Sequence, residues 1–199
     1  MESYKTTEQL TIKDAIIYTM LFIAITWGFT LVSTRWLEQL TAQAVGSALR
    51  AIGLLSSWGV QEGDAYLSLV GENGLIRVTI IRECTAINVF AIVVGLILPL
   101  KTGSLKRKSL GIVFSAALLF LMNVSRIMLT VYLTGFNVPP FSWYFTNPTV
   151  EVYHYPISFI YGVIGVAILI VALNRWILPE LGDTLFGIID SIRNLLKLD

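Results

Sequence analysis

Residues 109–134 have the sequence SLGIVFSAALLFLMNVSRIMLTVYLT, and this stretch decides the class of fold. A helix needs about 20 mainly apolar residues to cross a hydrocarbon core about 30 Å thick, and the stretch is long enough. Asn123 and Arg126 interrupt it three residues apart, on nearly the same face of a helix. The stretch therefore predicts a transmembrane helix that carries a polar pair.

The composition of the whole chain agrees with a membrane protein. Of its 199 residues, 55% are hydrophobic and 14% are charged, whereas about a quarter are charged in soluble domains. The net charge of +1 gives no sign of nucleic-acid binding. One cysteine and one histidine exclude an intramolecular disulfide and argue against a metal site, so no cofactor is expected.

Four segments are apolar enough to span a membrane: residues 15–32, 85–100, 109–134 and 156–173. Residues 101–108, KTGSLKRK, hold four basic residues and no acidic one, and the positive-inside rule places them in the cytoplasm. Both termini are then cytoplasmic, and residues 33–84 and 135–155 lie outside. We expect a single multi-pass domain, residues 1–199, in the plasma or inner membrane.

The segments between the spans have patterns of their own. Residues 41–60 place Val45, Ala48 and Ile52 on one helical face, which predicts an amphipathic helix at the outer interface; a spanning helix is the alternative. Residues 65–82 contain two runs rich in branched residues around an Asn-Gly turn, which predicts an extracytoplasmic β-hairpin.

Residues 180–199 carry apolar residues at helical spacing, which predicts a cytoplasmic amphipathic helix. The predicted fold is therefore an all-α membrane protein. It is a polytopic helical bundle with about four transmembrane helices, interfacial amphipathic helices and a small extracytoplasmic β-hairpin.

Three reactive side chains are predicted at one depth. Cys84 stands at the outer end of the second span, and His154 stands just before the fourth. Arg126 lies about 25 Å from the start of the third span at 1.5 Å per residue, near the outer boundary. Three segments therefore deliver a thiol, a guanidinium and an imidazole to the outer leaflet.

Each of these side chains also has a plain structural explanation. Arg126 can snorkel to the headgroups, a lone buried cysteine such as Cys84 usually acts as a small hydrophobe, and His154 can be an interfacial residue between two tyrosines. Against this, a cationic neighbour stabilises a thiolate, which is the nucleophilic form. The residues alone support a hypothesis of cysteine catalysis at the outer leaflet.

Three short motifs resemble the exosortase/archaeosortase family of integral membrane cysteine transpeptidases. They are ECTA at 83–86, NVSR at 123–126 and the histidine of VYHYP at 152–156. Their order, spacing and membrane side match that family over roughly residues 65–173. The resemblance implies an enzyme that recognises a C-terminal sorting tail on a membrane-anchored secreted protein. It cleaves near the sorting motif and, in some members, joins the new carboxyl end to a lipid.

The resemblance also implies roles for the residues. Cys84 would attack the scissile carbonyl and form a thioester, Arg126 would favour the thiolate or the oxyanion, and His154 would transfer protons. Glu83, Asn88 and Asn123 are expected to support these groups. The implied partners are tail-bearing substrate proteins, the lipid bilayer and a lipid acceptor.

Two other functions remain as alternatives. A non-catalytic membrane component of an export or polysaccharide assembly system would keep its function after Cys84→Ser or His154→Ala. A small transporter could use Arg126 as an anion site, but it would need further polar residues at mid-membrane. Residues 15–32 and 156–173 supply almost none.

Overall fold

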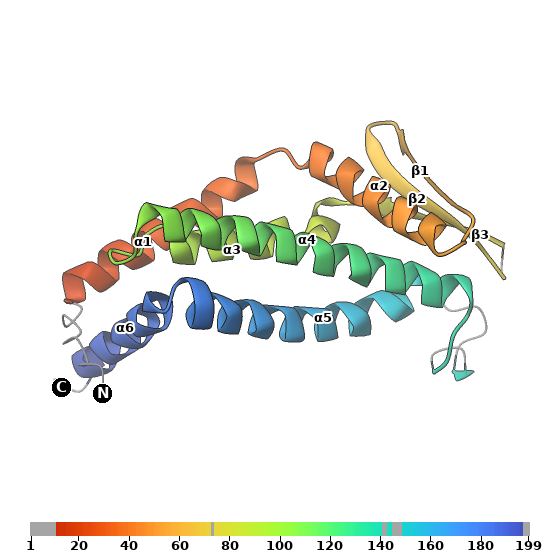
Figure 1. Cartoon of the computed structure of the whole chain (residues 1–199). Helices are drawn as coiled ribbons and strands as arrows, with labels where there is room; N and C mark the ends of the chain where they lie inside the picture. The colour runs from red at the N-terminus through yellow and green to blue at the C-terminus, as the bar shows by residue number, and fades with distance from the viewer. Residues whose placement is uncertain (1–10, 73, 141–142, 145–148, 197–199) are drawn as a thin grey trace. The chain divides into compact units, whose positions relative to one another are not determined.

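The computed structural model describes residues 11–196, apart from residue 73, residues 141–142 and residues 145–148 (Figure 1). The chain divides into two compact units. The first unit comprises residues 1–31, 90–115 and 169–199, and the second comprises residues 32–89 and 116–168.

Helices dominate the structure, and one small sheet accompanies them. In chain order the elements are α1 (Ile12–Gly28), the 3₁₀ helix η1 (Phe29–Leu31), α2 (Arg35–Ala51), β1 (Ser56–Gln61), β2 (Asp64–Gly71), β3 (Gly74–Ile80), the 3₁₀ helix η2 (Arg82–Thr85), α3 (Ile87–Ile97), α4 (Leu105–Gly135), α5 (Val150–Ala172), the π-helical segment η4 (Leu173–Ile177) and α6 (Glu180–Leu196). The predicted class, a mostly helical membrane protein with a small sheet, is confirmed.

Three helical segments are long and apolar enough to cross a membrane: Ile12–Leu31, Leu105–Gly135 and Val150–Ile177. They correspond to the first, third and fourth predicted spans. The last begins at Val150, before the predicted start at Pro156, so His154 belongs to α5 itself. Its first turn holds Glu151, and an acidic residue is favourable at a helix N-terminus.

The segment 85–100 differs from its prediction as a full-length span. It forms only the 11-residue helix α3, which is about 16 Å long at 1.5 Å per residue. Ala86 interrupts the chain before α3, because its φ of 59° is left-handed. Pro99 follows the helix, and a proline disfavours helical geometry at the residue before it. Among the described residues, α3 is therefore too short to cross a 30 Å core as a helix alone.

In the first unit, α1 packs antiparallel to α3. The Tyr18 hydroxyl donates a hydrogen bond of 2.6 Å to the Leu96 carbonyl oxygen near the end of α3. At the other end of α1, Phe29 meets Phe90 edge to face, with ring centroids 5.9 Å apart. These contacts pair the start of one helix with the end of the other.

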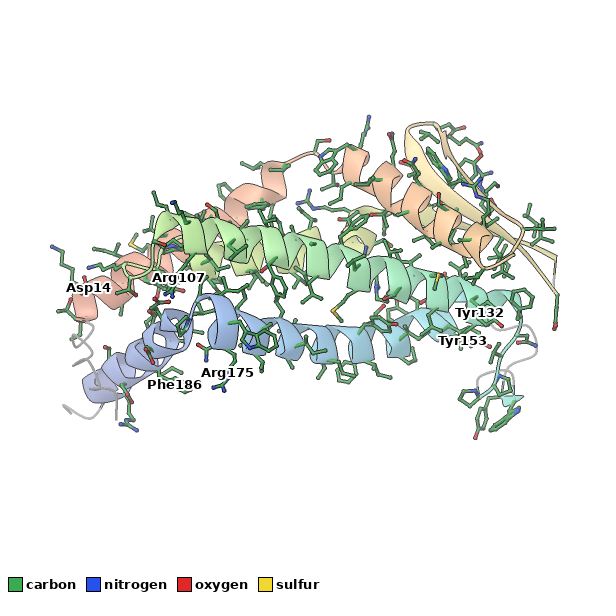
Figure 2. The ribbon with its side chains drawn as sticks, in the orientation of Figure 1. Asp14, Arg107, Tyr132, Tyr153, Arg175 and Phe186 are labelled. Atoms are coloured by element: carbon green, nitrogen blue, oxygen red, sulfur yellow. The ribbon has the colours of Figure 1, made fainter. Side chains whose placement is uncertain are left out.

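Two ion pairs join the basic segment 101–108 to other parts of the first unit. Lys101 pairs with Asp14 in the first turn of α1. Arg107 pairs with Glu180 at the start of α6, at 3.0 Å; Figure 2 labels Asp14 and Arg107. The start of α1, the basic segment and the start of α6 therefore lie together. The helix predicted at 180–199 is present to Leu196, and residues 197–199 lie outside the described residues.

The second unit is built on an antiparallel sheet with the strand order β1-β2-β3. One face of the sheet packs against both α2 and α4 in a single buried core. The sheet contributes Ala65, Leu67, Leu69 and Ile80, α2 contributes Ala42, Val45 and Leu49, and α4 contributes Ile127 and Val131. This core holds the sheet beside the part of α4 that carries Asn123 and Arg126.

The hairpin predicted at 65–82 is present as β2 and β3, and its turn residue Asn73 lies outside the described residues. A third strand, β1, precedes it and had been assigned to the helix predicted at 41–60. Three strands over a packed face are more stable than an isolated hairpin, so β1 completes a sheet that the hairpin alone would not make.

The helix predicted at 41–60 ends early because of a glycine. Gly53 has a φ of +86° and terminates α2 with two hydrogen bonds. Its N–H bonds to the Arg50 oxygen at 2.9 Å, and the N–H of Leu54 bonds to the Leu49 oxygen at 3.1 Å. This pattern is a Schellman motif, and it turns the chain away from the helix axis into β1.

The tip of the hairpin is attached to the end of α4. The Glu72 N–H donates a hydrogen bond of 3.0 Å to the Gly135 carbonyl oxygen. A Cβ atom on Gly71 would lie 2.2 Å from that oxygen, so only glycine permits this approach. The sheet is thus held to α4 at its tip as well as through the core.

Candidate active site

Cys84 lies in the short turn η2, directly between β3 and α3. Its N–H bonds back to the Ile81 oxygen at 2.8 Å, and the Thr85 hydroxyl bonds to the Arg82 oxygen at 2.6 Å. The turn ends at Ala86 in the left-handed conformation, which costs a non-glycine residue roughly 1–2 kcal/mol. Strain of this kind clusters at functional sites. The half-buried thiol is free.

Asn123 connects this turn to Arg126. Its side chain is 4% exposed; the Nδ2 group donates to the Cys84 carbonyl oxygen, and Oδ1 accepts a 2.9 Å hydrogen bond from Arg126 Nη2. The amide therefore uses its donor on the backbone of Cys84 and its acceptor on the guanidinium. The expected pairing of Asn123 with Arg126 on one helix face is present.

Arg126 connects α4 to α5 through a serine. Its Nη1 donates to the Ser158 hydroxyl at 2.6 Å, and Ser158 Oγ lies 3.4 Å from His154 Nε2. Asn123, Arg126, Ser158 and His154 form one continuous hydrogen-bonded series, called here the polar chain, which starts at the carbonyl of Cys84. All of its members belong to the second unit.

Arg126 carries the permanent positive charge of the polar chain. It is close enough to Cys84 to interact with it electrostatically, and the two side chains it bonds, Asn123 and Ser158, are neutral. A guanidinium has five N–H donors, and these two contacts use one donor on each terminal nitrogen. The remaining donors suit an oxyanion.

A pocket of about 170 Å³ lies beside the polar chain. Glu83, Asn123, Arg126 and Ser158 form its polar end. Its walls are mainly apolar and come from α3, α4 and α5, with Val89, Leu119, Met122, Tyr161 and Val166 among them. The pocket therefore continues from the polar chain along α4 and α5 into apolar surroundings.

The structure brings together most of the residues that the sequence singled out. The polar chain contains Asn123, Arg126 and His154 and starts at the carbonyl of Cys84. Glu83 lines the pocket. Asn88 is exposed and lies outside this arrangement. Within the described residues no hydrogen bond joins His154 to Cys84, because Ser158 and Arg126 come between them.

Sequence reasoning missed Ser158. It stands four residues after His154, and on a helix that spacing places two side chains on one face. The signal was available, but the helix had been predicted to start at Pro156, and the spacing carries information only if the helix already includes His154.

The part of the chain that the structure describes has no group of three or more His, Cys, Asp or Glu residues that could hold a metal.

The sequence profile of the transmembrane exosortase family (Exosortase_EpsH) matches residues 9–173. The chain belongs to this family. The match takes in Cys84, the whole polar chain and the pocket, and it extends to α1 and α2, beyond the three motifs on which the resemblance rested. Neither a curated protein nor a solved structure matches the chain.

Proposed function

We propose that this exosortase is a membrane-embedded cysteine transpeptidase. It cleaves the C-terminal sorting signal of a secreted protein through a thioester on Cys84 and transfers the protein to a lipid or another surface acceptor. The observation that carries the proposal is the polar chain, which links the turn of the only thiol to a cation and an imidazole on two other helices. Membership of the exosortase family supports it.

In the first half-reaction the Cys84 thiolate attacks the scissile carbonyl carbon. Arg126 balances the charge of the thiolate and then of the tetrahedral oxyanion, and such a charge acts more strongly in a low dielectric than in water. The carbon–nitrogen bond breaks, and His154 gives a proton to the leaving amine. The products are a thioester on Cys84 and a released sorting tail.

In the second half-reaction the acceptor attacks the thioester carbon. His154, now neutral, takes the proton of the attacking group, and the Cys84 thiolate leaves. The contact of His154 with Ser158 rather than with Cys84 supports separate roles for the two side chains. The imidazole transfers protons to the leaving group and from the entering group, and Arg126 stabilises the thiolate.

The active site belongs on the extracytoplasmic side in this proposal. The positive-inside rule favours a cytoplasmic position for the basic segment 101–108, and the ion pair of Lys101 with Asp14 supports the same side for the start of α1. The chain must then cross back between α1 and Lys101. The proposal assigns this return to α3, which spans about 16 Å, together with the residues between it and Lys101.

Processing of exported proteins tests the activity. Cells that depend on this chain are supplied with the parent, with Cys84→Ser or with His154→Ala, and the C-terminal masses of exported membrane proteins are compared. We expect at least one protein to lose its tail only with the parent. Hydroxylamine added to membranes should capture the thioester as a hydroxamate at the new C-terminus.

Phe159→Ala is the matched control, because Phe159 lies on the same helix as His154 and is 72% exposed; it should process normally. Processing that persists with Cys84→Ser would refute the mechanism and favour a non-catalytic membrane component.

Alkylation of Cys84 tests the membrane side and the role of Arg126. Since the chain has one cysteine, every labelled thiol is Cys84. A membrane-impermeant reagent should label it on intact cells, and a small neutral reagent should react more slowly in Arg126→Ala than in the parent at equal pH. Labelling only after the cells are opened would place the site on the cytoplasmic side.

A further inference from the structure

β3 is an edge strand that leads directly to the candidate nucleophile. It pairs with β2 on one side only, and after Ile80 the extended residue Ile81 continues it into the Cys84 turn. The carbonyl oxygen of Ile81 accepts the hydrogen bond of the Cys84 N–H. The free edge of the sheet and the site are therefore continuous.

The register identifies which backbone groups face outward from β3. The Val70 N–H bonds to the Leu55 oxygen on the β1 side, and alternate residues of a strand face opposite neighbours. Leu69 of β2 consequently faces β3, where it pairs with Ile76. The residues of β3 that face away from β2 are Leu75, Arg77 and Thr79.

These outward groups have no partner within the described residues. No backbone hydrogen bond engages Leu75, Arg77 or Thr79 outside the sheet, and all three residues are exposed, Leu75 to 70%. Three N–H donors and three carbonyl acceptors thus alternate along an open edge. An extended polypeptide backbone is the chemical partner that matches such an array.

The usual devices that block an edge strand do not operate here. Natural sheets protect their edges with prolines or with charged side chains along the edge. β3 has no proline, and its one charged residue is Arg77. The Arg77 guanidinium lies 3.7 Å above the centre of the Tyr66 ring and donates to Gln61 Oε1 at 2.6 Å, so it is held across the face of the sheet.

We infer that the free edge of β3 binds the substrate as a fourth strand, taking the extended segment of the exported protein just before the scissile bond. The hairpin tip is tied to Gly135 at the C-terminal end of α4, whereas the Cys84 turn is tied to Asn123 further back. In the proposed orientation the C-terminal end of α4 lies outside, so the hairpin tip is farther out than the Cys84 turn. A substrate whose exported part comes first and whose membrane tail comes last therefore runs parallel to β3. Main-chain hydrogen bonds give affinity with little dependence on sequence, and they deliver the scissile carbonyl to Cys84. The inference rests on the proposed function and names how its substrate is held.

Amide hydrogen exchange tests the inference directly. The full chain with Cys84→Ala is placed in lipid nanodiscs. The probe is a synthetic peptide that copies the cleavage region of a protein whose processing depends on Cys84. Exchange at Leu75, Arg77 and Thr79 should slow at least about tenfold with the peptide, since a bonded amide exchanges only when the bond opens. Val60, on the outer edge of β1 and 47% exposed, provides the internal control and should not change.

Proline substitutions provide a second test in the active enzyme. Thr79→Pro removes one outward donor and leaves the bonds to β2 in place, and prolines are tolerated at such edge positions. We expect processing to fall about tenfold. Thr79→Ala, which removes only the side chain, and Val60→Pro, which removes an outward donor from the opposite edge, should process normally.

The outcomes separate this inference from the activity itself. Absence of any Cys84-dependent processing would overturn both. Normal processing in Thr79→Pro, or edge amides that the peptide leaves unprotected, would overturn the strand-addition inference and leave the catalytic proposal standing. Protection that rises with enzyme concentration without peptide would identify the edge as a contact between two copies of the chain, and would also overturn it.

Discussion

Two basic side chains on α4, Lys108 and Arg126, differ in what they bond. Lys108, in the first unit, is 9% exposed and donates to the carbonyl oxygens of Leu98 and Leu100 at the end of α3. Arg126, in the second unit, donates to two neutral side chains, Asn123 and Ser158. The first cation caps a helix end, and the second belongs to a series that reaches a thiol and an imidazole.

The difference gives a criterion for separating structural from functional cations in an apolar protein. A cation near the end of a helix complements the dipole and the unsatisfied carbonyls there, and removing it should cost stability. A cation beside a pocket can have N–H donors that no group of the fold accepts, and these donors are available to a ligand. Removing it should cost activity more than stability.

Removing Arg126 is expected to have the largest effect. Arg126→Ala should lower the rate of tail removal per folded molecule by at least about 100-fold, because loss of one oxyanion donor costs that much in other enzymes. Arg126→Lys keeps the charge but not the forked geometry, and we expect an intermediate rate. Pulse-labelled processing in membranes measures both.

Arg175→Ala is the control for Arg126→Ala, since Arg175 is an exposed arginine in the segment η4, and it should process at the parental rate. An Arg126→Ala enzyme that retains half of the activity would remove the distinction between the two cations.

Removing Lys108 should affect stability instead. Lys108→Met leaves the Leu98 and Leu100 oxygens without their donor, and a lost hydrogen bond to a charged group costs about 2 kcal/mol. We expect the free energy of unfolding to fall by about that amount in a denaturant titration, with an unchanged processing rate per folded molecule. Lys106→Met, at an exposed neighbouring position, should change neither quantity.

Ser158 is expected to act as a positioning residue between Arg126 and His154. Ser158→Ala should slow processing about tenfold, and Ser158→Thr, which keeps the hydroxyl, should restore most of the rate. In a His154→Ala background the same substitution should have less than about a twofold effect, because residues of one series act as a unit. Additive losses in the double variant would assign Ser158 a merely structural role.

Ser125→Ala is the matched control for that experiment. The Ser125 hydroxyl is spent on the Met122 oxygen of its own helix, at 2.8 Å, and it takes no part in the polar chain. Its loss should leave processing unchanged in both backgrounds.

The sequence was sufficient for the parts of the site that depend on depth and helical spacing. The lengths of the apolar spans placed Cys84, Arg126 and His154 at one level, and the three-residue spacing paired Asn123 with Arg126. Both inferences rest on the fixed rise and periodicity of a helix. The pairing of Asn123 with Arg126 is present as a hydrogen bond, and the common depth in the membrane stays a prediction.

The errors occur where a local backbone choice interrupts that periodicity. The segment 85–100 was read as one continuous span, but Ala86 is left-handed and separates the Cys84 turn from α3, on which Asn88 is exposed. Gly53 likewise ends α2 inside a pattern whose apolar spacing continues through Ile52 and Leu55. Periodicity alone cannot detect such breaks, because an alanine or a glycine also fits within a helix.

The smallest expected effect tests whether the pocket belongs to the site. A Cβ atom on Gly162, which lines the pocket, meets nothing within 4 Å, so Gly162→Leu fills the space without displacing a neighbour. A cavity of about 150 Å³ holds a benzene molecule, and this one, at about 170 Å³, suits one bulky apolar group of the substrate. We expect processing to fall about fivefold, with Gly162→Ala in between.

Gly28→Leu is the control, because Gly28 is the last residue of α1 and also meets nothing within 4 Å, but it lines no part of the pocket. It should process at the parental rate. If Gly162→Leu also processes at the parental rate, the pocket beside the spare donors of Arg126 is a packing defect and does not bind substrate. The contrast with Lys108 would then rest on the polar chain alone, and the loss in Arg126→Ala would have to arise from the thiolate rather than from the oxyanion.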